Sequence, residues 1–117
     1  MSFREVESRL VGARADVARM VESIIGCKWS LSVLRLLRDG VHRPGEMQRR
    51  TEGLTTKVLN ERLTKLQRFG IIRKTVYPET PPHVEYRFTE FGTRFLEIVD
   101  LVERLQGELN RSLDDQP

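Results

Sequence analysis

Apolar and polar positions follow the period of an amphipathic helix along most of the chain. Apolar residues recur every three or four positions, as expected when one face of a helix is buried. We expect helices over residues 16–26, 28–40, 44–51, 55–69 and 89–113. Asp16 and either Thr55 or Thr56 are suitable N-caps, and Gly70 is a suitable C-terminal end for the fourth helix.

The pattern changes after the fourth helix. In residues 71–89, two runs rich in Ile, Val, Tyr and Phe flank the sequence PETPPH. Proline has no N–H to donate to a β-ladder, so the prolines belong to a turn and the flanking runs to a two-stranded hairpin. The order is therefore helix, helix, short helix, turn, helix, hairpin, helix. This order predicts one domain over residues 1–117, mainly α with a small β-hairpin, in a winged helix-turn-helix arrangement.

The helix over residues 55–69 has two contrasting faces. Leu59, Leu63 and Leu66 form an apolar stripe, and at 100° per residue most of the polar side chains fall on the opposite side. Alone, this polar face is also compatible with a solvated surface. In a winged helix-turn-helix, however, the second helix of the pair enters a major groove about 12 Å wide. We therefore interpret residues 55–69 as a recognition helix and residues 71–88 as the wing.

The charge is divided unevenly along the chain. The net charge is only +3, but residues 28–74 contain 12 Lys/Arg and 4 Asp/Glu, so a basic middle lies between acidic ends. Such segregation suits a domain whose middle faces a polyanion. A basic face that is simply solvated explains the charge equally well.

Three stretches carry a resemblance to a known family. They are GCKWSLSVLRLL, KVLNERLTKLQRFGII and VYPETPPHVEYRFTEFG, which together run from Gly26 to Gly92. This region resembles the HxlR family of bacterial winged-helix transcription regulators, relatives of the MarR type. The resemblance implies a dimeric DNA-binding repressor or activator. Of the two we expect a repressor, and a two-fold homodimer would read an inverted repeat in double-stranded DNA. Family members often respond to electrophiles or oxidants, so a small-molecule effector is implied as a further partner.

The DNA-contacting residues are expected in three groups. The residues that would face the major groove are Thr55, Thr56, Lys57, Asn60 and Thr64. Those that would bind phosphates from the preceding short helix are Arg43, Arg49 and Arg50. Those that would approach the DNA backbone from the hairpin are Lys74, His83 and Arg87. Lys65 is a further candidate, lower on the recognition helix. Arg62 lies nearer the apolar stripe, and an anchor to a carboxylate is as plausible for it as a DNA contact.

The two ends of the chain are expected to form a dimer interface. Residues 1–15 would be an N-terminal arm, and residues 89–113 a helix whose apolar residues alternate at spacings of four and three. The interface residues would be Phe3, Val6, Leu10, Phe95, Ile98, Val102, Leu105 and Leu109. The alternative is that the last helix packs wholly on its own domain. Its acidic residues Glu97, Asp100 and Glu103 are interpreted as a solvated face.

Cys27 is the only thiol and hence the one candidate redox sensor. It lies next to Lys28 near a helix start, where the helix dipole lowers a thiol pKa. The thiol of HxlR-type sensors, however, sits about twelve residues before the Lys-Trp pair, a position that is Asp16 here. We therefore favour a structural role for Cys27 as a small residue at a helix junction.

Other classes of function find little support in the sequence. The two histidines are not spaced from other possible ligands in a way that suggests a metal site. The sequence contains no nucleophile motif and no phosphate-binding loop. We therefore expect no enzyme activity and no cofactor. No apolar run approaches the roughly 18–20 residues needed to cross a bilayer, and the first residues do not form a secretory signal, so we expect a cytoplasmic protein without membrane contact. A winged-helix module that binds a protein instead of DNA is the main alternative.

Overall fold

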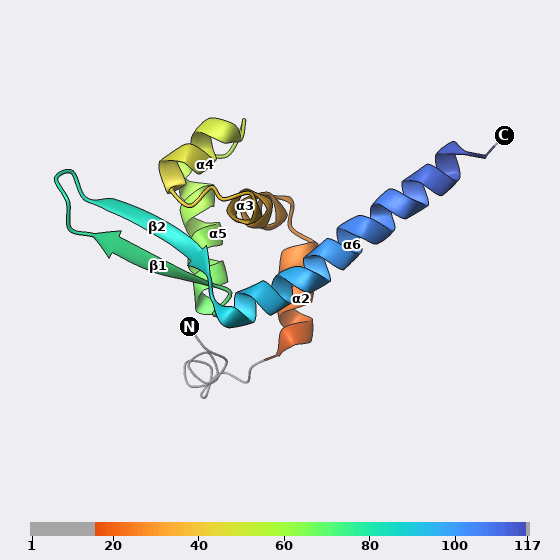
Figure 1. The fold of residues 1–117 in the computed structure, drawn as a ribbon, viewed down its shortest axis with the longest axis horizontal. Helices are drawn as coiled ribbons and strands as arrows, with labels where there is room; N and C mark the ends of the chain where they lie inside the picture. Colours follow the sequence, from red (N-terminus) through yellow and green to blue (C-terminus); the bar gives the residue numbers. More distant parts are fainter. Residues whose placement is uncertain (1–15, 117) are drawn as a thin grey trace.

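The fold is described here from a computed structural model, which defines residues 16–116. Its elements, in chain order, are α2 (Val17–Ile25), α3 (Lys28–Arg38), α4 (Pro44–Arg50), α5 (Thr56–Arg68), β1 (Ile72–Tyr77), β2 (His83–Phe88) and α6 (Glu90–Asp114). Figure 1 shows α5 at the centre, the hairpin on one side of it and α2 on the other, with α6 crossing the domain and extending beyond it. The predicted winged helix-turn-helix is confirmed.

The helix ends are set by local chemistry that the sequence makes visible. The side chain of Asp16 accepts a hydrogen bond from the Arg19 amide, and that of Thr55 accepts one from the Val58 amide, both at 3.2 Å. Each bond satisfies an N–H group that has no partner within its own helix. Gly70 follows α5 with a φ of 75°, a left-handed conformation that favours glycine. The predicted caps at Asp16 and Thr55 and the predicted end at Gly70 are confirmed.

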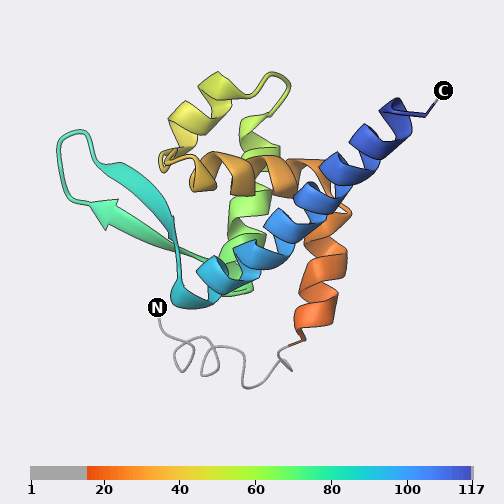
Figure 2. The ribbon, with the colours of Figure 1, turned by 45° about the vertical axis from the view of Figure 1, so that its right-hand side comes forward.

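The core lies where α3, α5 and the first half of α6 meet. Leu59, Leu63 and Leu66 of α5 are at most 1% exposed, and Phe95 of α6 is equally enclosed at 2%. They pack in the same cluster as Val33, Leu34 and Leu37 of α3. Figure 2 shows α3 and α6 both passing in front of α5. The leucine stripe of α5 therefore faces inward, as predicted.

The hairpin is fastened to the helices at its base. β1 and β2 pair antiparallel, with Ile72 opposite Phe88 and Tyr77 opposite His83. The Tyr86 amide donates to the His42 carbonyl at 2.8 Å, and the Thr89 amide donates to the Ile71 carbonyl at 3.0 Å. These bonds fix the direction in which the wing leaves the domain.

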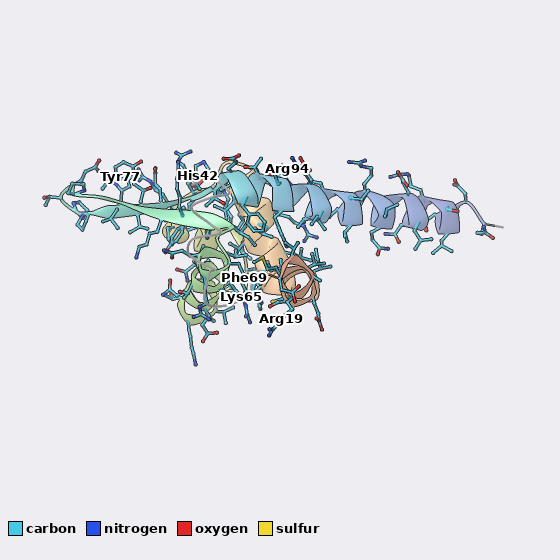
Figure 3. All side chains as sticks on the ribbon, turned by 90° about the horizontal axis from the view of Figure 1, so that it is seen from below. Arg19, His42, Lys65, Phe69, Tyr77 and Arg94 are labelled. Atoms are coloured by element: carbon cyan, nitrogen blue, oxygen red, sulfur yellow. The ribbon has the colours of Figure 1, made fainter. Side chains whose placement is uncertain are left out.

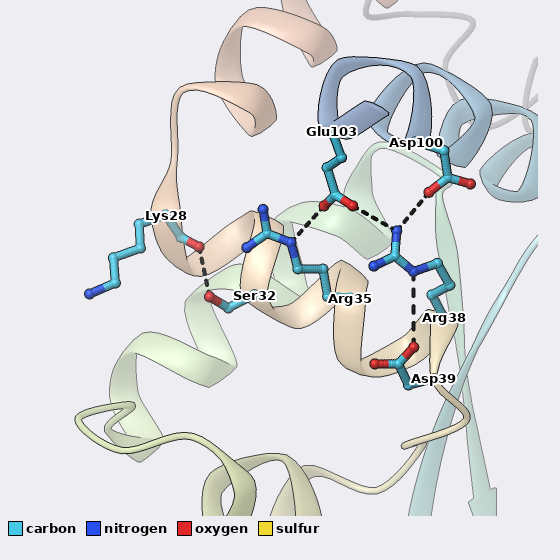
Figure 4. A network of polar contacts seen from close by, with 7 residues as sticks. All are labelled: Lys28, Ser32, Arg35, Arg38, Asp39, Asp100 and Glu103. Carbon is cyan, nitrogen blue, oxygen red and sulfur yellow. Dashed lines mark hydrogen bonds and ion pairs between the residues drawn. The ribbon is translucent and has the colours of Figure 1, made fainter. Parts of the chain in front are cut away.

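An ionic cluster joins α3 to α6. Arg35 Nε lies 2.6 Å from Glu103 Oε1, while Arg38 Nη1 lies 2.7 Å from Asp100 Oδ1 and 3.0 Å from Glu103 Oε2 (Figure 4). The interpretation of Asp100 and Glu103 as a solvated face is therefore wrong. These carboxylates bond across more than sixty residues of sequence, a contact that helical periodicity cannot reveal. Within residues 16–116, Glu97 pairs only with the exposed Arg94 on its own helix.

The Glu103 carboxyl has an altered pKa because of this cluster. Burial raises the pKa, but hydrogen bonds and charge from Arg35 and Arg38 outweigh burial and hold the pKa below its ordinary value. A carboxyl with a depressed folded-state pKa stabilises the fold above its unfolded pKa, and this stabilisation is lost as the pH falls through the folded pKa.

We predict that Glu103→Gln lowers the free energy of unfolding by about 1 kcal/mol at pH 7, as expected for a partly exposed ion-pair network. Because wild-type Glu103 becomes protonated in acid, the difference should shrink as the pH falls below its folded pKa. Urea unfolding at pH 7 and at lower pH measures both values. Glu108→Gln is the control, since Glu108 has no ion-pair partner within residues 16–116. A pH-independent difference would contradict the ionic role of Glu103.

Candidate nucleic-acid interface

The turn between α4 and α5 is held by side chains on three sides. Gln48 Nε2 donates to Thr56 Oγ1 at 2.9 Å, which joins the two helices directly. Leu54 is 5% exposed and anchors the turn in the core. Gly53 has a φ of 85°, and a Cβ there would lie 3.6 Å from the ring of Trp29. The angle between α4 and α5 is therefore fixed by packing, as a helix-turn-helix requires.

The predicted groove-facing residues lie together on the outer side of α5. Thr55, Thr56, Lys57, Asn60 and Thr64 are all exposed. The hydroxyls of Thr55 and Thr56 already accept hydrogen bonds, from the Val58 amide and from Gln48. The side chains of the other three make no hydrogen bond or ion pair within residues 16–116. Lys57, Asn60 and Thr64 are therefore the residues best placed to meet an external partner.

The three arginines predicted to grip phosphates differ in their surroundings. Arg43 caps α4, and its Nε lies 3.7 Å from Glu85 of the hairpin. Arg50 Nη2 lies 3.0 Å from Glu46, one turn earlier. Arg49 is exposed, and no carboxylate of the described residues lies within 4.0 Å of it. Of the three, Arg49 alone carries an un-neutralised charge.

Lys65 and Arg62 face the junction between α2 and α3. Lys65 Nζ donates to the Ser23 carbonyl at 2.8 Å, and burial lowers the pKa of this ammonium group. Figure 3 places Lys65 on the side of α5 that faces α2. Arg62 Nε is buried without an acceptor, and no carboxylate in the described part of the chain pairs with it. The alternative in which a carboxylate anchors Arg62 is therefore not found within residues 16–116.

The wing divides its polar residues between two faces. Residues paired across antiparallel strands share a face, so Lys74 lies with Tyr86, whereas His83 and Arg87 lie with Tyr77 and Arg73 on the other side. Figure 3 places Tyr77 along the hairpin and His42 at its base. The three predicted wing contacts therefore cannot all approach one strand of DNA from the same face.

The face that carries His83 and Arg87 is an organised polar network. Arg87 Nη1 lies 3.2 Å from His42 Nε2, and His83 Nδ1 lies 2.8 Å from Glu79 Oε2 and stacks on Tyr77. Arg73 is exposed directly opposite Arg87 and was missed in the sequence analysis. The register of the two strands, if known, would have identified Arg73 as the residue opposite Arg87.

Helix α5 carries several cations that have no carboxylate partner among residues 16–116. Arg35 and Arg38 of α3 are neutralised by α6. No carboxylate among the described residues lies within 4.0 Å of any cation of α5, namely Lys57, Arg62, Lys65 and Arg68. The helix that presents the exposed polar face therefore also carries four cations unpaired within residues 16–116, an electrostatic pattern typical of a nucleic-acid interface.

Comparison with known proteins agrees with this geometry. The family model described as HxlR-like helix-turn-helix matches residues 24–112, from the end of α2 through most of α6. The chain belongs to the HxlR family. Its helix-turn-helix is thus α4–turn–α5, and its wing is the β1–β2 hairpin.

Known transcriptional regulators are similar to this chain in sequence and in structure. An HTH-type transcriptional regulator of Methanothermobacter thermautotrophicus is 43% identical over 76 residues, which cover 65% of this chain and 58% of that protein. A structure described as a MarR-family regulator from Enterococcus faecalis V583 has a TM-score of 0.75 at 27% identity, over 85% of this chain and 90% of that one. The reduced form of the transcriptional regulator YodB from B. subtilis has a TM-score of 0.65 at 30% identity, over 74% of this chain and 84% of that one.

Two further observations concern other kinds of site in this HxlR-family chain. The described residues hold no group of three or more His, Cys, Asp or Glu side chains arranged to bind a metal ion. No described helix is long and apolar enough to cross a membrane.

Cys27 caps α3 at the junction with α2 and is half-buried. Burial raises the pKa of its thiol, but the neighbouring polar groups of Ser30 and the charge of Arg62 outweigh burial and hold the pKa below its ordinary value. From the sequence, this effect was expected from the adjacent Lys28. The structure instead brings Arg62, thirty-five positions away, to the thiol.

We predict that the pH midpoint for alkylation of Cys27 by iodoacetamide lies below that of a free cysteine peptide, because the thiolate is the reactive form. Arg62→Gln should raise the midpoint, since it removes the stabilising charge. Mass-spectrometric alkylation rates across pH give these values. Arg68→Gln, a change to an exposed cation of the same helix, should leave the midpoint unchanged. An equal shift in both variants would show that Arg62 has no specific role.

Proposed function

We propose that this HxlR-family protein is a transcriptional regulator that binds double-stranded DNA in a sequence-specific manner. The recognition helix α5 would lie in the major groove, and the β1–β2 hairpin would act as the wing. The observation that carries this proposal is the outer face of α5. There Lys57, Asn60 and Thr64 are exposed, have no partner within residues 16–116, and lie on a helix whose cations meet no carboxylate in that range.

Each of these residues has a role that its chemistry supports. The Asn60 amide can bond bidentately to the edge of an adenine, Lys57 suits a guanine or a phosphate, and the Thr64 methyl can contact a thymine methyl. Arg49 would bind a phosphate and fix the register without reading sequence. Arg87, held by His42 and 3.6 Å from Glu85, would approach the backbone from the wing. A protein-binding winged-helix module would have no need of this set of exposed cations and amides.

We predict that Asn60→Ala weakens binding by about 1–3 kcal/mol at one base position and relaxes specificity there. Arg49→Gln should instead weaken binding to every sequence and reduce the slope of log K against log salt by about one. Selection of bound duplexes from a random pool gives the site, and fluorescence anisotropy at several salt concentrations gives affinities and slopes. Arg104→Gln, an exposed arginine on α6, is the control. Wild-type protein that selects no duplex would refute DNA binding and favour a protein partner.

We further propose that the protein is a homodimer joined through the second half of α6. The predicted apolar stripe is divided by the fold: Phe95 is 2% exposed in the chain's own core, and Ile98 packs partly against it. Val102, Leu105 and Leu109 are 39%, 54% and 55% exposed, and Leu101 and Leu113 extend the patch. Phe3, Val6 and Leu10, also predicted at the interface, lie outside the described residues.

A groove next to this stripe supports the same proposal. It lies between α3 and α6 and is lined by Ile25, Leu31, Val99 and Val102, with Arg35 and Glu103 among its polar residues. Apolar side chains of a second copy would bury both the groove and the leucines. Two recognition helices related by a two-fold axis would read an inverted repeat, with half-sites about one helical turn apart.

We predict that Leu105→Glu combined with Leu109→Glu converts the dimer to a monomer, because buried unpaired carboxylates oppose association. Sedimentation equilibrium at micromolar concentration measures the mass. Arg104→Glu adds negative charge at an exposed position of the same helix and should leave the dimer intact. Wild-type protein that sediments only as a monomer would refute the dimer while leaving DNA binding open to its own test.

A further inference from the structure

We propose that Lys28, at the start of α3, contacts a DNA phosphate on the side of the recognition helix opposite the wing. This inference rests on the proposed function and extends its interface to an element outside the helix-turn-helix and the hairpin.

The position of Lys28 relative to α5 follows from the packing. Figures 1 and 2 both show the hairpin on one side of α5, with α2 and its junction to α3 on the other. The bond from Lys65 Nζ to the Ser23 carbonyl, 2.8 Å long, ties α5 to this junction. Lys28 is the first residue of α3 after the junction. It therefore flanks the recognition helix on the side that the wing does not cover.

The Lys28 side chain is held near the beginning of α5. Its Nζ lies 4.8 Å from the centroid of the Trp29 ring, within the range of a cation–π interaction. The same ring meets Gly53, in the turn that leads into α5. Figure 4 shows the Lys28 side chain directed away from Glu103 and Asp100, the carboxylates that neutralise α3 at its other end. Trp29 thus couples Lys28 to the turn that positions the recognition helix.

The charge of Lys28 is exposed and has no ion-pair partner in the part of the chain that the structure describes. No carboxylate of residues 16–116 lies within 4.0 Å of its ammonium group. The first turn of α3 contains no acidic residue, so the positive end of the helix dipole adds to the same local potential. An exposed ammonium stacked on an indole can turn toward a phosphate at little cost, because the cation–π interaction at an exposed site is weak.

The geometry of DNA supplies a ligand at this place. A helix inserted in the major groove has a phosphate backbone on each side, since the groove is only about 12 Å wide. The wing accounts for one flank of α5 in the proposed function. Lys28 would serve the other flank, so that phosphates on both strands fix the helix in the groove.

The test compares Lys28→Gln with wild type, Lys28→Arg and the Arg104→Gln control. Anisotropy titrations use a labelled operator duplex and an unrelated duplex at several salt concentrations. We expect Lys28→Gln to weaken binding to both duplexes by a similar factor and to reduce the salt slope by about 0.9, the value for one phosphate contact. Lys28→Arg keeps the charge and should keep the wild-type slope, and Arg104→Gln should match wild type.

Trp29 gives a second measurement, because it is the only tryptophan in the chain. In the wild type, addition of duplex should change its emission as Lys28 moves from the ring to a phosphate, and the change should be smaller in Lys28→Gln. A wild-type slope in Lys28→Gln would overturn the inference. If Lys28→Arg weakened binding and lowered the salt slope as much as Lys28→Gln, the inference would also be overturned, since loss of packing would then explain the effect. Wild-type protein that binds neither duplex would instead refute the proposed function itself.

Discussion

Burial of the α5 leucines against α3 is the interaction on which the rest of the structure depends. With Leu59, Leu63 and Leu66 fully enclosed, the rotation of α5 about its own axis is fixed. That rotation leaves Lys57, Asn60 and Thr64 exposed on the opposite side. A helix that carried the same residues but could turn by 100° would present a different set to solvent. The hydrophobic core therefore selects which polar residues are available for recognition.

The sequence predicts those parts of the fold that are coded locally. Caps such as Asp16 and Thr55, the glycine after α5 and the proline-rich hairpin turn act within a few residues, so their effects are visible without a structure. Which parts of α6 are buried is not determined locally in this way. Its apolar stripe is continuous in sequence, yet Phe95 is buried and Leu105 is exposed, because the rest of the domain covers only the first part of a long helix.

The candidate site shows the same division between local and long-range information. Sequence identifies Arg43, Arg49 and Arg50 as equal candidates, but Glu85 of the hairpin and Glu46 compensate two of them. Likewise, Lys65 belongs to a basic helix in sequence but donates to a backbone carbonyl of α2 in the structure. Whether a cation is free for a phosphate depends on acceptors brought near it by folding. Charge counting finds the right element but not the right residues.

Helix α3 has a mechanical consequence for the whole molecule, because it is fixed at both ends to different parts. Near its C-terminal end, Arg35 and Arg38 form ion pairs with α6. At its N-terminal end, Trp29 packs beside the turn before α5. With a rise of 1.5 Å per residue, the helix is about 16 Å long, so a tilt of about 5° at one end displaces the other by more than 1 Å. Helix α3 thus connects α6 directly to the turn that positions the recognition helix.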